Sequence, residues 1–157
     1  MFLEKALAKT FSKYYNEHML IETGLLNKLK HYFLKRTDIA FAFLYGSYAR
    51  GTAHKNSDVD IAVYFYPAVR TPIQYEEEVY YNGEDEIWAD LDLLLGKEVE
   101  LLVLNRAAAV ICASATRGIQ VAMKDWNLYF DYIETVSRDA EDLMQMRIDD
   151  FLIRCSA

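Results

Sequence analysis

The sequence of 157 residues predicts one α/β (α+β) domain over residues 1–157. Short apolar runs typical of strands alternate along the chain with segments whose apolar residues recur at helical spacing. Hydrophobic residues make up 53% of the chain, which is enough to fill a sizeable core. No internal repeat and no low-complexity linker divides the chain. A single α/β unit with helices at both ends is therefore the simplest description.

The first half of the chain is predicted to form two helices and then two strands. Apolar residues at steps of three and four indicate helices over residues 3–15 and 25–36, with Gly24 as the interruption between them. The run Ile39–Tyr45 is short, aromatic and uninterrupted, as a strand buried on both faces is. Residues 58–63 alternate apolar side chains with acidic or small ones, which predicts the second strand. The prolines at 67 and 72 mark a loop, and we predict mostly irregular structure for residues 75–83.

The second half is predicted to form helices over residues 85–95 and 106–117 and strands over residues 99–104 and 119–123. Gly96 is the expected stop of the first of these helices. A long amphipathic helix follows over about residues 125–154. Because a chain this short has little other core for that helix to cover, we expect part of its apolar face to contact a partner.

The composition restricts the class of partner and the compartment. The chain has 24 acidic and 17 basic residues, a net charge of -7, and so repels phosphate backbones at long range; nucleic acid is an unfavourable main partner. Neither a secretory signal nor an apolar run long enough to span a bilayer is present, which predicts a cytoplasmic protein without membrane contact. Cys112 and Cys155 are then expected to be reduced thiols, with Cys112 a small buried residue of its alanine-rich helix.

The stretch LYGSYARGTAHKNSDVDIAV, residues 44–63, carries the candidate chemistry. Gly46 directly follows a predicted buried strand, where the lack of a Cβ lets the backbone turn sharply and approach a ligand. Ser47 can donate its hydroxyl and its backbone N–H to a phosphate oxygen, and a short helix beginning at Tyr48 would add its own N–H groups. The same loop of this acidic protein also holds three potential positive groups: Arg50, His54 and Lys55.

Asp58 and Asp60 are the candidate metal ligands. Residues two apart on a strand point to the same face, so the two carboxylates are expected to lie close together. Their mutual repulsion is relieved by a cation, and Mg²⁺ prefers one or two carboxylates together with substrate phosphates. Gly-Ser alone is common in turns and Asp-x-Asp alone is common on exposed strands. The combination at this spacing is the specific signal.

A strand, Gly-Ser, ten residues and then Asp-x-Asp on a second strand resemble the nucleotidyltransferase superfamily that includes DNA polymerase β and kanamycin nucleotidyltransferase. Within it, GSYARGTAHKNSDVDIAV is similar to the minimal nucleotidyltransferase (MNT) antitoxins, which are paired with HEPN-domain RNase toxins. The stretch LLGKEVELLVLNRA extends the resemblance over most of the chain. The resemblance implies a nucleotidyltransferase fold, with a small mixed β-sheet flanked by helices and a long C-terminal helix.

For the nucleotide, the resemblance implies that Gly46 and Ser47 hold the triphosphate of ATP, with Arg50 and Lys55 beside it as further binding residues. The choice of ATP over other triphosphates comes from the resemblance, since no residue of the motif reads a base edge.

For the chemistry, the resemblance implies that Asp58 and Asp60 bind Mg²⁺ and align the α-phosphate with an attacking hydroxyl. Members of the superfamily usually carry a third carboxylate, commonly Asp, on a later strand. The matching residue here is Glu100, a candidate catalytic residue and third metal ligand. Its side chain is one methylene longer than that of Asp, which leaves open whether activity is retained, slowed or lost. Glu98 on the same strand face is the second candidate.

The resemblance implies an ATP-dependent protein adenylyltransferase, the antitoxin of a type VII-like HEPN/MNT toxin–antitoxin pair. It would transfer AMP to a hydroxyl, expected to be a tyrosine, of the cognate HEPN toxin in a hetero-oligomer, and so inactivate the toxin. Two alternatives stay open. One is transfer to a small molecule such as an aminoglycoside, which an acidic surface suits although a second domain to close a pocket is missing. The other is a non-catalytic antitoxin that neutralises the toxin by binding alone.

Overall fold

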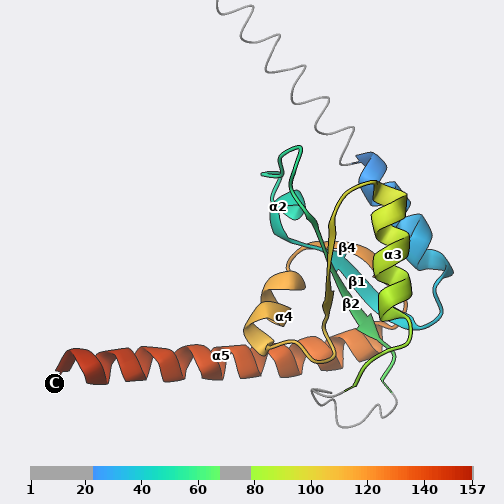
Figure 1. Cartoon of the computed structure of the whole chain (residues 1–157). Helices are drawn as coiled ribbons and strands as arrows, with labels where there is room; N and C mark the ends of the chain where they lie inside the picture. Colours follow the sequence, from blue (N-terminus) through green and yellow to red (C-terminus); the bar gives the residue numbers. More distant parts are fainter. Residues whose placement is uncertain (1–22, 68–78, 157) are drawn as a thin grey trace, which may run out of the picture.

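The computed structural model describes residues 23–67 and 79–156, and Figure 1 shows their arrangement. The elements, in chain order, are a helix over residues 23–35, β1 (Ile39–Leu44), α2 (Gly46–Ala49), β2 (Val59–Phe65), α3 (Glu84–Leu95), β3 (Val99–Val103), α4 (Ala109–Ala115), β4 (Ile119–Met123) and α5 (Trp126–Ser156). The predicted α/β class with a long C-terminal helix is confirmed. The extent of the domain over residues 1–157 stays a prediction, and the helix predicted over residues 3–15 lies outside the described residues.

The four strands form one mixed sheet in the order β3-β2-β1-β4. β1 is antiparallel to both β2 and β4, whereas β2 and β3 are parallel and are connected through α3. All six residues of β1 are buried, as the uninterrupted apolar run predicts for a strand with neighbours on both sides and helices on both faces. The end of β1 therefore lies beside the start of β2, and the start of β2 pairs with the start of β3, which is an edge strand of the sheet.

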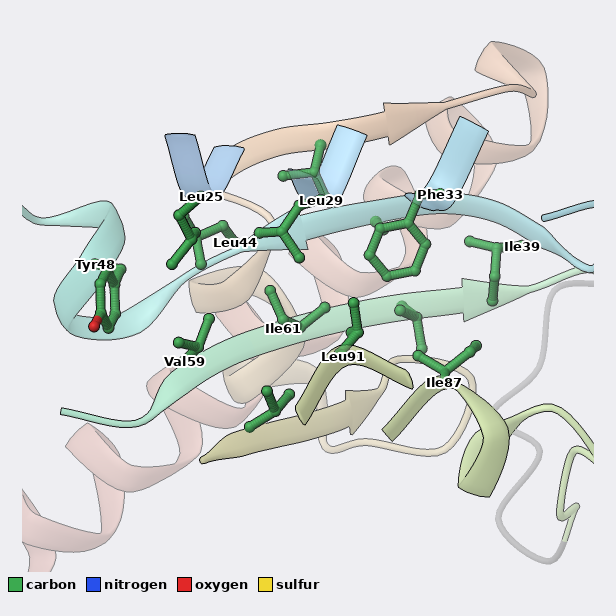
Figure 2. Close-up of a cluster of buried hydrophobic side chains, with 14 of the residues drawn as sticks. Leu25, Leu29, Phe33, Ile39, Leu44, Tyr48, Val59, Ile61, Ile87 and Leu91 are labelled. Carbon is green, nitrogen blue, oxygen red and sulfur yellow. The ribbon is translucent and has the colours of Figure 1, made fainter. Parts of the chain in front are cut away.

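One face of the sheet, the closed face, is sealed by the helix over residues 23–35 and by α3. Figure 2 shows Leu25, Leu29 and Phe33 of the first helix and Ile87 and Leu91 of α3 converging on the β1 and β2 side chains. These helical residues recur at steps of three and four, so they form one stripe that the sheet buries. The sheet contributes the alternating apolar side chains of its strands: Ile39, Leu44, Val59, Ile61, Val63, Val99 and Val103.

The other face, the site face, is covered by α4 and α5. Phe41 of β1 stacks on Tyr64 of β2 with ring centroids 4.6 Å apart, and Tyr132 of α5 packs against both rings. Cys112 of α4 is fully buried in this cluster, as predicted. Both cysteines are free thiols, and Cys155 is exposed.

Several element boundaries differ from the predictions. The helix over residues 23–35 already includes Gly24, so this residue does not interrupt it within the described chain. β2 begins at Val59 rather than at residue 58 and runs two residues further, to Phe65. α4 begins at Ala109 rather than at residue 106, because Ala108 is extended and the Arg106 side chain is drawn to Glu84. Within the described chain, no helix combines the length and the apolar character needed to cross a bilayer.

Candidate active site

The site begins where β1 ends and the chain turns at Gly46. The backbone N–H of Tyr45 donates to the Asp60 carbonyl at 2.9 Å, which continues the β1–β2 pairing one step beyond the strand and brings Gly46 beside Asp60. Gly46 has a φ of +67°, and a Cβ built on it would lie 1.9 Å from Oδ2 of Asp60. No other residue fits there without moving the carboxylate. The glycine predicted from the sequence is therefore required by the acidic residue fourteen positions later.

Ser47 is oriented by the same carboxylate. Its backbone N–H donates to Asp60, and its carbonyl accepts a bond of 3.0 Å from the N–H of Thr52. The short helix α2 begins at Gly46, two residues earlier than the predicted start at Tyr48. The backbone N–H and the hydroxyl of Ser47 were both predicted to donate to a phosphate. Because the N–H donates to Asp60 instead, the hydroxyl is the group that suits phosphate binding.

Asp60 and Glu100 are direct neighbours across the parallel β2–β3 pair. Laterally paired residues point to the same face of a sheet, so both carboxylates lie at the site face. Burial raises the pKa of Asp60, and the negative charges of Glu100 and Asp58 raise it further. The structure thus brings together the three carboxylates singled out by the sequence, although exposed Asp58 precedes β2 instead of lying on it. Such clustered like charges favour a cation.

Tyr45 is a site residue that the sequence reasoning missed. It stands opposite Asp60 in the β1–β2 pairing, so Tyr45, Asp60 and Glu100 form one row across three adjacent strands. Burial, together with the charges of Asp60 and Glu100, raises the pKa of the Tyr45 hydroxyl to about 12. The hydroxyl is therefore neutral near pH 7 and lies within the electrostatic influence of both carboxylates. The sequence feature that could have identified Tyr45 is its position directly before Gly46.

The positive groups predicted around the loop are exposed, and a further one joins them. Arg50, His54 and Lys55 all lie at the surface between α2 and β2. Lys97, which was not predicted, donates from Nζ to the Lys55 carbonyl at 3.1 Å, and its Nζ lies 5.8 Å from the centre of the Tyr48 ring. Lys97 thereby ties the loop to the start of β3, next to the carboxylates. Basic residues therefore occupy the loop before β2 and the turn before β3, the two segments that lead into the strands carrying Asp60 and Glu100.

The carboxylates fit a cation that arrives together with a phosphate ligand. Within residues 23–67 and 79–156, no group of three or more His, Cys, Asp or Glu side chains is arranged to hold a metal on its own. Mg²⁺ commonly takes only one or two carboxylates and completes its coordination with phosphate oxygens and water. The raised pKa of Asp60 is the observation that fits such an ion, since a cation would offset the repulsion between the carboxylates. Glu98, the second candidate, is exposed at the entry to β3.

A Gly-Ser turn in contact with a row of carboxylates on a small mixed sheet is the arrangement of a nucleotidyltransferase. The comparison with known families agrees. The family described as "Polymerase beta, Nucleotidyltransferase" matches residues 27–127, well over half of the chain, and the chain belongs to this family. It is similar to the protein adenylyltransferase MntA of Shewanella oneidensis, with 28% identity over 118 residues that cover 73% of this chain and 78% of the relative. The resemblance to the superfamily and to its minimal antitoxin group is confirmed.

Solved structures agree on the fold. The crystal structure of a toxin-antitoxin with AMP-PNP has a TM-score of 0.56 and 24% identity, and covers 83% of this chain and 98% of the other. A second structure holds the tri-AMPylated HEPN toxin of Shewanella oneidensis in complex with its MNT antitoxin. Its TM-score is 0.51 with 20% identity, and it covers 86% of this chain and 98% of the other. At these identities the likeness shows the nucleotidyltransferase fold, which confirms the predicted fold.

Proposed function

We propose that this protein is an adenylyltransferase antitoxin, which transfers AMP from ATP to a hydroxyl, expected to be a tyrosine, of a cognate HEPN RNase toxin. The observation that carries the proposal is the contact between Gly46 and Asp60: the glycine of the phosphate turn lies against the second aspartate of the Asp58, Asp60 pair. The family relationship and the similarity to the adenylyltransferase MntA support the same reaction. Modification of the toxin would inactivate it.

In the proposed reaction, the acceptor oxygen bonds to the α-phosphorus of ATP, the bond from that phosphorus to the bridging oxygen breaks, and pyrophosphate leaves. The acceptor proton passes to a carboxylate, for which Glu100 stands beside Asp60 in the paired strands. The Ser47 hydroxyl binds the triphosphate, and Arg50 and Lys55 attract it from the exposed loop. Proximity and orientation then supply a large part of the rate enhancement.

Mg²⁺ is part of the proposal. Asp58 and Asp60 would hold it, with Glu100 as the third candidate ligand, and when bound it supplies charge neutralisation for the α-phosphate and for the departing pyrophosphate. The chain's own contribution is to hold Asp60 in one position, through the Ser47 N–H and the close approach of Gly46.

Intact-mass spectrometry of the toxin tests the proposal. The protein is incubated with the toxin, ATP and Mg²⁺, in parallel with an Asp58→Asn, Asp60→Asn variant. We expect mass increments of one or more AMP units on the toxin with the wild-type protein and none with the variant. Increments that persist with the variant, or that are absent with the wild type, contradict the proposal. If RNase activity is blocked in complexes without any increment, the non-catalytic antitoxin is the correct reading.

A further inference from the structure

β4 is an edge strand of the sheet. It comes last in the order β3-β2-β1-β4, and within the described residues it pairs with β1 alone. Figure 2 shows it as the pale orange strand at the top of the view, outside β1. The free side of such a strand presents backbone N–H and C=O groups that can pair with a further strand. At the opposite edge part of β3 is already occupied, because the Trp88 indole N–H donates to the Val99 carbonyl at 3.0 Å.

A hollow with a volume of about 510 Å³ runs along the free side of β4. On the sheet side it is lined by the five successive residues 120–124. Because successive side chains of a strand point to opposite faces, a hollow that touches all five lies at the edge of the strand. The other wall is one side of the helix over residues 23–35, with the exposed side chains of Asn27, Lys30, His31 and Leu34. A groove between a helix and a free strand edge, which we call the β4 groove, is a shape that an extended peptide fills.

The β4 groove is basic although the protein is acidic. The ionisable side chains in its lining are Lys30, His31 and Lys124, and no carboxylate is among the lining residues. The Lys124 ammonium is held at one end of the groove by the bond that it donates to the Arg36 carbonyl. Lys30 and His31 are exposed, and no hydrogen bond or ion pair within the described part of the chain engages either side chain. In a protein of net charge -7, this groove therefore favours an occupant that carries carboxylates.

We propose that the β4 groove binds an extended acidic segment of a partner protein, which pairs with β4 as a further strand and directs its carboxylates to Lys30 and His31. In this mode of recognition the main-chain hydrogen bonds supply affinity, and the alternate side chains of the segment supply specificity. A second copy of this chain suits the groove less well. Two β4 edges paired antiparallel would bring the same basic sides of both helices together, and like charges oppose that contact. Asp60 and Glu100 lie on β2 and β3, beyond β1, so this inference goes beyond the proposed reaction and does not depend on it.

A short synthetic peptide tests strand addition to the full chain. The peptide alternates threonine with glutamate, so that its carboxylates lie on one side when it is extended. Titration of the protein with this peptide, followed by NMR, should change the chemical shifts of residues 120–124 and of Lys30 and His31. Amides on the free side of β4 should exchange with solvent more slowly once the peptide is bound. Binding should weaken as salt is added, because the charges that attract the peptide are exposed.

Two N-methylated forms of the peptide separate strand pairing from charge. The N–H groups of alternate residues in a strand point to the same side. Methylation of the glutamate amides and methylation of an equal number of threonine amides therefore block opposite sides of the peptide, while the charge stays the same. We expect one form to bind at least about tenfold more weakly than the unmethylated peptide, and the other to stay within about threefold.

Matched variants of the protein test the charge of the groove. Lys30→Glu reverses a charge in the groove, and Lys35→Glu makes the same change on the same helix outside the lining. Both side chains are exposed, so both variants keep the fold. We expect Lys30→Glu to weaken binding of the unmethylated peptide at least about tenfold, and Lys35→Glu to weaken it by less than about threefold.

Three results would overturn the proposal: equal weakening by the two N-methylated peptides, equal affinities of the two lysine variants, or shift changes confined to the basic loop over residues 50–55. Two further results would overturn it by assigning the groove to another occupant. A homodimer in sedimentation that the peptide dissociates would show that β4 pairs with a second copy of this chain. A single-stranded oligonucleotide that displaces the peptide and shifts the same residues would make the groove a nucleic-acid site.

Discussion

The two faces of β2 follow different rules within seven residues. Val59, Ile61 and Val63 point into the closed face and are completely buried among leucine, isoleucine and phenylalanine side chains. On the site face, Ala62 and Tyr64 are buried, but Asp60 at the near end is a half-exposed carboxylate beside a second one. Apolar contacts on the closed face stabilise the fold, whereas the carboxylates at the start of β2 on the site face repel one another. Stability and chemistry are thus placed on opposite sides of a single strand, and substitutions should separate them.

The largest expected effect is on the site face. Asp60→Asn should lower AMP transfer by about a thousandfold or more, because it removes a charge on which the reaction depends. The same change should raise the Tm. The pKa of Asp60 is raised in the folded protein, so its charge costs stability at neutral pH, and that cost is lost as the pH falls from the folded pKa to the lower pKa of the unfolded chain. Calorimetry and intact-mass assays measure both effects. A lower Tm would show that Asp60 stabilises the fold, and would contradict the separation of stability and chemistry between the two faces of β2.

On the closed face the pattern reverses. Ile61→Ala should destabilise the protein by about 2–5 kcal/mol, because it opens a cavity in a fully packed cluster. The activity of the remaining folded protein should stay within about twofold, since the side chain points away from the carboxylates. Urea unfolding and initial rates test this. A large loss of rate in fully folded protein would mean that the closed face also positions the site.

Gly46→Ala should affect both properties. The left-handed backbone costs about 1–2 kcal/mol for a residue with a Cβ, and the Cβ displaces Asp60, which we expect to slow transfer about a hundredfold. Gly51→Ala is the matched control: its φ is +68°, but a Cβ there meets no atom within 4 Å. The control should show the loss of stability without the loss of rate. Equal rates in the two variants would rule out the steric role of Gly46.

The smallest effect is a displacement of the pH–rate profile, measured on the activity that remains when Glu100, the proposed proton acceptor, is replaced. Burial is the first cause of the raised pKa of Asp60 and the charge of Glu100 is the second, so Glu100→Gln should let Asp60 ionise at lower pH. The acid limb of the pH–rate profile should then move to lower pH. Glu98→Gln, at the exposed start of the same strand, should leave the limb in place. An unchanged limb in both variants would separate Glu100 from Asp60 in function.

The sequence was sufficient for those features whose cause is local. Helical spacing, the apolar run before Gly46 and the spacing of Asp58 and Asp60 depend on residues within a few turns of one another, and these elements lie where they were predicted to within a few residues. The turn at Gly46 could be predicted as well. Its reason could not, since the glycine is required by a carboxylate that reaches it only across the paired strands.

The tertiary structure determines which residues are neighbours across the paired strands. Family resemblance selected Glu100, but only the parallel register of β2 and β3 places it beside Asp60, and only the β1–β2 pairing adds Tyr45 to the same row. The contact of Lys97 with the loop arises in the same way. Local features depend only on residues that are near one another in the chain. Strand register depends instead on how helices and loops elsewhere in the protein pack. A sequence pattern can therefore supply the chemical groups of this site, and the sheet determines which of them meet.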